Sequence, residues 1–241
     1  MRMMEATLWS VVLLLTVIHQ GVSQLNNDQK QLLLDLHNWA RGNVTQPRAA
    51  DMERMQWNNE LAGVAQTYSA RCVFEHNPNR ASQAPSFRNV GENLAISSGR
   101  GDAYEFLFTL WHDERQHYTY STRSCDANQV CGHYTQVVWA TSNQLGCGAT
   151  MCATVEGFRG TNALNLVCNY GPAGNFRGQF PYISGASCSS CPTNQRLCSS
   201  NLCSNSTGSS SIPGGSGAAA DNRPTLLMVT TLVMVIFSLL Y

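Results

Sequence analysis

The cysteines constrain this chain more than any other feature of its sequence. There are ten of them, and all lie at or beyond Cys72. An even number of cysteines in a secreted chain is typical of a disulfide framework, whereas free thiols and metal-binding cysteine pairs belong mainly to intracellular proteins. For a secreted chain we therefore expect five disulfides, although the spacing alone does not give their connectivity.

The N-terminus predicts secretion. Arg2 is followed by an apolar run from Leu8 to Ile18 and then by small residues at 21–23, which is the order of a signal peptide. The alternative is an uncleaved anchor, but the apolar run is shorter than the ~20 residues that a membrane-spanning helix needs. We predict that residues 1–23 are removed and that the mature chain begins at Gln24 in an oxidising compartment.

The C-terminus predicts a glycosylphosphatidylinositol (GPI) anchor. Residues 226–241 are apolar, and no basic residue follows them to hold a cytoplasmic tail in place. Small residues at 214–218 and a polar spacer at 221–224 precede this stretch, which is the layout of a GPI signal. We predict attachment at Ser216. The alternative is a short hydrophobic tail that spans the membrane or stays attached.

Between these ends there is room for one medium-sized domain and a small appendage. The segment from Cys188 to Cys203 is too short for a core of its own, so two disulfides would have to hold it together. The predicted organisation is a signal peptide at 1–23, a main domain at 24–183, a cysteine-rich hinge at 184–204, a Ser/Gly-rich stalk at 205–221 and an anchor signal at 222–241.

Charge and glycosylation signals describe the expected surface. The chain has 15 acidic and 15 basic residues, and Lys30 is its one lysine. No basic run of the kind that follows phosphates is present, so we do not expect nucleic acid as a partner. Asn43-Val44-Thr45 and Asn205-Ser206-Thr207 are N-glycosylation sequons, which mark surface positions if they are used.

Apolar residues spaced by three and four predict three helices in the first half of the chain. The first begins after possible capping residues at 26–28 and ends at Gly42. Asn58 is expected to cap the second and Asp102 the third. On the first helix, the polar residues of the segment 37–41 either fasten it to a neighbouring backbone or lie in solvent. Residues 77–86 are predicted to form an exposed loop.

The second half of the chain predicts strands, at Thr135–Ala140, Gly146–Val155 and Leu164–Tyr170. Helices followed by strands indicate an α+β fold, a layered sandwich. His133 precedes the first of these strands, so we expect it at a strand end, where side chains converge on a cleft. A lone histidine more commonly hydrogen-bonds a turn, and Glu114 taken alone is an ordinary solvated helix carboxylate.

Four motifs in this order resemble the CAP superfamily of cysteine-rich secretory, antigen 5 and pathogenesis-related proteins. The resemblance is strongest to the peptidase inhibitor 16 and glioma pathogenesis-related branch. The motifs are His37-Asn38-x-x-Arg41, Gly91-Glu92-Asn93-Leu94-Ala95, Gly132 to Trp139 (GHYTQVVW) and Cys168 to Phe176 (CNYGPAGNF). The resemblance covers roughly residues 28–183 and implies a three-layer α-β-α sandwich stabilised by disulfides. One departure is Asn165, where the family pattern has an apolar residue.

The resemblance also implies a cleft lined by His76, Glu92, Glu114 and His133. Two neutral imidazoles can bind a divalent ion while the carboxylates orient them or hold a metal-bound water. Zn²⁺ fits such a site, although no cofactor is required. The disulfide pairs that the resemblance implies are Cys72–Cys152, Cys147–Cys168, Cys188–Cys198 and Cys191–Cys203. Cys125 and Cys131 then remain to pair across a short loop.

Two functions follow from this interpretation. The first is a non-enzymatic extracellular binding or signalling module, anchored to the membrane through GPI, which recognises a protein or a lipid such as a sterol. The absence of a Ser or Cys nucleophile motif favours it. The alternative is a Zn²⁺-dependent hydrolase, most simply a protease, that activates water in the His/Glu cleft.

Overall fold

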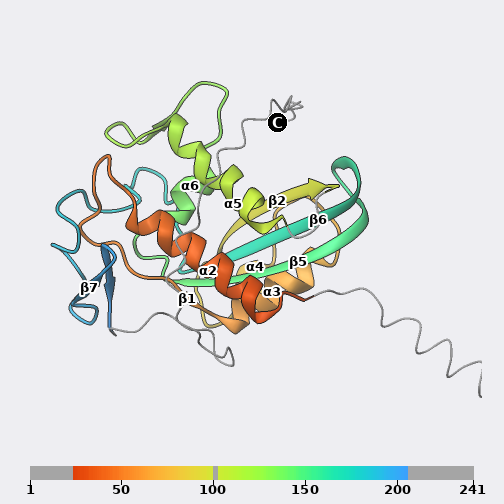
Figure 1. Cartoon of the computed structure of the whole chain (residues 1–241), viewed down its shortest axis with the longest axis horizontal. Coiled ribbons are helices and arrows are strands. Elements are labelled where there is room, and N and C mark those ends of the chain that lie inside the picture. Colours follow the sequence, from red (N-terminus) through yellow and green to blue (C-terminus); the bar gives the residue numbers. More distant parts are fainter. Residues whose placement is uncertain (1–23, 100–102, 206–241) are drawn as a thin grey trace, which may run out of the picture.

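The computed structural model describes residues 24–99 and 103–205 (Figure 1). The predicted signal peptide, the cap residue Asp102, the attachment site Ser216 and the anchor signal therefore lie outside the described residues. Across the described ranges, no helix is both long and apolar enough to cross a membrane.

A four-stranded sheet forms the middle of the domain, in the order β1 (Gln56–Trp57), β5 (Gln144–Val155), β6 (Phe158–Gly171) and β2 (Gly91–Ser98). β1 runs parallel to β5, and the other neighbours are antiparallel. β5 and β6 form a long hairpin, which turns at Gly157 with a φ of 82°. The predicted strands at 146–155 and 164–170 are confirmed, and both are longer than predicted.

Helices cover both faces of this sheet, so the predicted three-layer α-β-α sandwich is confirmed (Figure 1). α2 (Asn27–Gly42), α5 (Tyr104–Asp113) and α6 (Gly132–Val137) share a core with Leu164, Leu166, Cys168 and Tyr170 of β6. α3 (Asn59–Ser69) packs on the opposite face, against Leu94 and Val167. Side chains alternate between the faces of a strand, so residues 163–171 of β6 are buried on both sides.

The shorter elements lie around these layers. They are α4 (Arg80–Gln83), a 3₁₀ helix at Glu114–His117, and two hairpins, β3 (Tyr118–Thr119) with β4 (Ser124–Cys125) and β7 (Leu197–Ser199) with β8 (Leu202–Ser204).

Side-chain caps begin the first two helices as predicted. The Asn26 side chain accepts a hydrogen bond from the Gln29 N–H, and the Asn26 N–H donates to the side-chain oxygen of Gln29, which completes a capping box. Asn58 caps α3 through the Leu61 N–H. α5 instead begins after Ala103, which provides no side-chain cap.

The polar residues of α2 fasten it to neighbouring backbone, the first of the two predicted alternatives. Arg41 is almost fully buried and donates to the carbonyls of Glu53, Val137, Trp139 and Ala140. Burial lowers the pKa of its guanidinium to about 9, so the group stays charged at neutral pH. Asn38 exchanges two hydrogen bonds with the backbone of Met55. These buried hydrogen bonds hold the backbone near Met55 and at residues 137–140 against α2, which apolar contact with the helix alone would not do.

The prediction of a strand at Thr135–Ala140 is wrong. Residues 132–137 form α6, with the Thr135 N–H bonded to the Cys131 carbonyl and the Val138 N–H to that of Tyr134. Val137 and Val138 are fully buried, so their apolar character serves packing in the core rather than a strand. β-propensity reflects burial on a packed surface, and here a helix end supplies that surface. His133 consequently lies in the first turn of a helix, not at a strand end.

Two other expectations need correction. The segment 77–86 is not a plain exposed loop, because it contains α4 and buries Asn77 and Ala84. Asn165 departs from the family pattern without leaving the core, since it is fully buried and donates to the Ser69 carbonyl at 3.1 Å. The paired amide donor replaces apolar contact with a hydrogen bond to α3.

Five disulfides hold the described chain. Their pairs are those that the resemblance implies, including the one that joins the two remaining cysteines. They are Cys72–Cys152, Cys147–Cys168, Cys188–Cys198, Cys191–Cys203 and Cys125–Cys131. All ten cysteines are used, and none is free.

Candidate functional site

Four elements supply the candidate site residues, and the structure groups them as two histidine–carboxylate pairs. His76 lies in the loop after α3, and its Nδ1 is 2.9 Å from Oε1 of Glu92 on β2. His133 lies in the first turn of α6, and its Nδ1 is 2.5 Å from Oε1 of Glu114, immediately after α5. The sheet thus places Glu92, and the end of α5 places Glu114. Each carboxylate holds one imidazole.

The pair of Glu92 and His76 joins a buried carboxylate to an exposed ring. The Glu92 side chain is 0% exposed, and that of His76 is 57% exposed. Oε1 of Glu92 also accepts from the Asn77 N–H at 2.8 Å, which holds the loop next to β2. Its other oxygen, Oε2, is buried and has no hydrogen-bond partner among the described residues. A buried carboxylate oxygen without a donor calls for a water or a cation.

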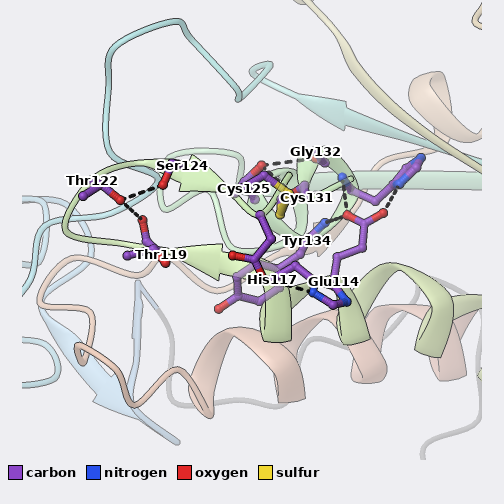
Figure 2. Close-up of a disulfide and its surroundings, with 12 residues drawn as sticks. Glu114, His117, Thr119, Thr122, Ser124, Cys125, Cys131, Gly132 and Tyr134 are labelled. Atoms are coloured by element: carbon purple, nitrogen blue, oxygen red, sulfur yellow. Dashed lines mark hydrogen bonds and ion pairs between the residues drawn. A yellow bond between two sulfur atoms is a disulfide. The ribbon is translucent and has the colours of Figure 1, made fainter. Parts of the chain in front are cut away.

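The pair of Glu114 and His133 is satisfied at every carboxylate oxygen. Oε2 of Glu114 accepts from the N–H groups of His133 and Tyr134, both at 3.0 Å, so Glu114 caps the start of α6. Figure 2 shows Glu114 beneath this helix start, with Tyr134 and the Cys125–Cys131 disulfide close by. The Trp111 ring stacks on His133 with centroids 6.3 Å apart. The imidazole is therefore fixed by a carboxylate and by an aromatic face.

A buried hydrogen-bond network ties α6 to the start of β2. Asn93 donates to the His133 carbonyl at 3.1 Å and to the Tyr170 hydroxyl at 3.0 Å. Tyr170 contacts Nε2 of His37 at 2.8 Å, and Nδ1 of His37 contacts the Leu33 carbonyl at 2.7 Å. A carbonyl accepts only, so Nδ1 carries the hydrogen and Nε2 accepts from the Tyr170 hydroxyl. Burial lowers the pKa of His37 to about 3, which keeps this ring neutral.

The approach of α6 to β2 leaves no room for a side chain at position 91. A Cβ on Gly91 would lie 2.1 Å from Oε1 of Gln136 on α6. That oxygen accepts from the Gly174 N–H at 3.0 Å, and the Gln136 amide nitrogen donates to Ser142 at 3.1 Å. The glycine of the Gly91-Glu92-Asn93 motif therefore permits the contact that places Glu92 near α6.

The hydrogen bonds determine what each imidazole can still do. An ionised carboxylate only accepts, so Nδ1 carries the hydrogen in both His76 and His133. Nε2 of each neutral ring then keeps its lone pair for a metal ion, with the carboxylate as its orienting partner. The donor types fit Zn²⁺, and the unpartnered Oε2 of Glu92 fits a nearby cation.

The two pairs do not form a closed cage. Among the residues that the structure describes, the only group of three or more possible ligand atoms within 4.8 Å of one another is that of Cys188, Cys191 and Cys203. These three sulfurs are committed to disulfides. An ion between His76 and His133 would thus have coordination positions left for water or a ligand.

The sequence reasoning missed the residues that hold the site together. Asn93, Tyr170 and Gln136 lie inside the quoted motifs, but a motif does not say which of its members touch. Their signal was a polar residue next to apolar neighbours in a segment that had to be buried.

Comparison with known proteins relates this chain to one family. A model described as the cysteine-rich secretory protein family (CAP) matches residues 34–170. The chain is 39% identical over 217 residues to human Peptidase inhibitor 16. The aligned region covers 90% of this chain and 43% of that protein. It is 43% identical over 175 residues to bovine GLIPR1-like protein 1, covering 71% of this chain and 69% of that protein. The chain spans less than half the length of the Peptidase inhibitor 16 relatives from mouse, human and cattle.

Solved structures show the same architecture. The venom allergen-like protein 4 of Schistosoma mansoni aligns with a TM-score of 0.56 at 27% identity, over 67% of this chain and 97% of that one. NaASP2, in a crystal structure described as containing Zn²⁺, aligns with a TM-score of 0.57 at 27% identity, over 77% of this chain and 98% of that one.

Proposed function

The chain belongs to the cysteine-rich secretory protein (CAP) family and is an extracellular CAP-domain protein, and from this premise we propose that it acts as a non-enzymatic binding module. One observation carries the proposal: both oxygens of Glu114 are occupied by protein donors. A general base in hydrolysis needs a carboxylate that can reach water. Glu92 and Glu114 instead orient imidazoles, and no cysteine is free to act as a nucleophile.

We propose further that the module binds a divalent metal ion, most simply Zn²⁺, through Nε2 of His76 and Nε2 of His133. The support is the donor chemistry, because each imidazole has its Nδ1 held by a carboxylate and its ring partly exposed. A crystal structure of the related NaASP2 is described as containing Zn²⁺, which is consistent with this assignment. With two protein ligands the remaining positions would be open to a partner.

The metal proposal is tested by calorimetric titration of metal-free protein, residues 24–205, with Zn²⁺. Binding should be lost in the double variant His76→Ala/His133→Ala. The matched control is His117→Ala, since His117 faces Asp126 at 3.3 Å in an exposed pair outside the site. Binding that persists in the double variant, or is absent from the unaltered protein, contradicts the metal site.

The proposed ligand is an extracellular protein or a lipid such as a sterol. Relatives named Peptidase inhibitor 16 and Peptidase inhibitor R3HDML favour a protein partner by their names alone. The test is capture of cell-surface proteins and binding to sterol-containing vesicles, with His117→Ala as a folded control. The enzymatic alternative predicts cleavage of a peptide library that stops with a chelator and in His133→Ala. Such cleavage would replace the binding proposal with a hydrolase.

Membrane attachment and glycosylation complete the proposal. We propose a GPI anchor at Ser216, supported by the order of small, polar and apolar residues at the C-terminus. Phosphatidylinositol-specific phospholipase C should then release the protein from cells, and retention after treatment would favour a membrane-spanning tail. Asn43 and Asn205 are both exposed, as N-glycosylation requires.

A further inference from the structure

A polar cavity lies where the hinge, residues 184–204, meets the CAP domain. Its volume is about 190 Å³, and its lining includes Arg54, Asn143, Gln144, Asn194, Gln195 and Asn205. None of these residues belongs to the two histidine–carboxylate pairs. At about 30 Å³ for each water molecule, the cavity has room for about six waters, or for one sugar ring.

Backbone contacts build this cavity from three parts of the chain. The Arg54 N–H donates to the Cys203 carbonyl at 2.8 Å, which joins the segment before β1 to the hinge. The Gln56 N–H donates to the Asn143 carbonyl at 2.8 Å, which joins β1 to the start of β5. The walls are therefore held by main-chain hydrogen bonds and not by mobile side chains alone.

A buried carboxylate fixes how the amides of the cavity are turned. Oε2 of Glu53 accepts from the side-chain nitrogen of Asn143 at 2.6 Å and from that of Gln195. Glu53 is only 6% exposed. Glu53 takes one hydrogen of each amide group, which turns the amide oxygens away from it. The Asn143 oxygen also accepts from Gln144 Nε2 at 3.5 Å, and each amide oxygen keeps a lone pair for a ligand's hydroxyl group.

Arg54 supplies donors to the same cavity. Its Nη2 donates to the Ser199 carbonyl at 2.8 Å, which anchors the guanidinium against the hinge. Among the described residues its guanidinium has no second acceptor within hydrogen-bond distance, which leaves N–H groups for an acceptor such as an acetamide carbonyl. An N-acetylhexosamine needs protein acceptors for its hydroxyl groups and a protein donor for its amide carbonyl. The amide oxygens and the Arg54 guanidinium meet these two needs.

Asn205 lies at this cavity, is exposed and begins a sequon with Thr207 at its third position. We propose that the first N-acetylglucosamine of a glycan on Asn205 occupies the cavity and fastens the hinge to the CAP domain. A single sugar binds weakly from solution, but covalent attachment gives it an effective concentration of the order of mM. The proposal is independent of the metal site and of the partner.

The test uses the full chain, produced in secretory cells with a mannosidase inhibitor so that its glycans stay high-mannose. The change Thr45→Ala removes the other sequon, so that the remaining glycan is on Asn205. Endoglycosidase H leaves the first sugar on the protein, whereas peptide-N-glycosidase F removes it. We expect the endoglycosidase H product to have the same melting temperature as the untreated protein. The fully deglycosylated product should melt lower, by roughly 2–4 °C.

Two variants separate the sugar from other effects of the treatment. Thr207→Ala keeps the Asn205 side chain and should reproduce the lower melting temperature without the Asp that full deglycosylation creates. Asn194→Ala alters the cavity wall, so its effect should disappear when it is combined with Thr207→Ala. Equal melting of the two enzyme products, additive effects of the two variants, or an unmodified Asn205 in mass spectrometry would overturn the proposal.

Discussion

The two histidine–carboxylate pairs have the same chemistry but opposite states of completion. In the pair of Glu114 and His133, both carboxylate oxygens have protein donors, and Trp111 stacks on the ring. In the pair of Glu92 and His76, one buried carboxylate oxygen has no partner among the described residues, and the ring is 57% exposed. The first pair is therefore satisfied within the fold, whereas the second leaves one buried acceptor that no donor among the described residues reaches.

The difference follows from how each histidine is attached. His133 lies on a helix whose backbone is bonded to Asn93 and through it to Tyr170 and His37. His76 lies in a loop held by the Asn77 N–H and by the Cys72–Cys152 disulfide four residues earlier. One ring is placed by the core, and the other is placed by a loop over the surface.

The largest expected effect is a loss of stability in acid. It tests the buried hydrogen-bond network of Asn93, Tyr170 and His37 that lies behind His133. The folded-state pKa of His37 is lowered to about 3, and that of His112 to about 4, both mainly by burial. Below pH 6.5 these histidines become protonated in the unfolded chain but stay neutral in the folded protein. The free energy of unfolding therefore falls as pH falls from 6.5 towards 3. His37 alone accounts for up to about 5 kcal/mol at the acid end. Urea unfolding between pH 7 and pH 4 measures this loss.

The variant His37→Gln provides the control for the acid prediction. It should be less stable at pH 7, because the Tyr170 contact is disturbed, but its stability should change less with pH. An equally steep pH dependence in His37→Gln would show that other groups cause the loss.

The next effect tests the completed pair directly. Glu114→Ala removes the acceptor of two α6 N–H groups and of the His133 ring. We expect the free energy of unfolding to fall by about 2–4 kcal/mol, because charged hydrogen bonds are lost and donors are left without partners. The control Glu105→Ala changes an exposed carboxylate on α5 and should stay within about 0.5 kcal/mol. A small loss in Glu114→Ala would remove the contrast between the pairs.

A smaller effect on stability is expected at the unfinished pair. Glu92→Gln keeps an oxygen for the Asn77 N–H. It also removes a buried negative charge, of which Oε2 has no donor among the described residues. We expect a change of about 1 kcal/mol or less in stability, with Zn²⁺ affinity lowered roughly 10–100-fold. Calorimetric titration beside urea unfolding separates the two quantities. A large loss of stability without loss of affinity would make Glu92 a structural residue.

The smallest effect on stability belongs to the exposed ring. His76→Ala should alter the free energy of unfolding by less than about 0.5 kcal/mol, as expected for a surface side chain. Its effect on Zn²⁺ binding should nevertheless be as large as that of His133→Ala. Equal losses of stability in the two alanine variants would show that both rings belong to the fold.

Local chemistry predicted much of the fold. Asn26 and Asn58 cap helices, and the strands at 146–155 and 164–170 are present, because capping and alternation act over a few residues. The sequence predicts a strand where α6 lies, because the run Val137-Val138-Trp139 has strand propensity and its burial comes from helices far along the chain. β2 gave no periodic signal, since residues 91–95 are buried on both faces.

The candidate site was predictable as a set of residues but not as two pairs. Motif resemblance brings His76, Glu92, Glu114 and His133 together without stating which carboxylate holds which ring. That choice depends on contacts between residues 16 and 19 positions apart, made by four different elements. The unequal exposure of the two rings depends on Trp111 and on the position of a loop, which no local pattern contains.

The buried guanidinium of Arg41 has a consequence for biosynthesis. Its acceptors include the Ala140 carbonyl, 99 positions further along the chain. A ribosome adding about 5–20 residues per second needs roughly 5–20 s to supply that stretch. During this interval Arg41 has only water and the Glu53 carbonyl as acceptors, so α2 emerges early and is locked late. α2 is therefore made well before the carbonyls that bury its guanidinium, and before the helices and strands that cover its apolar face in the folded domain.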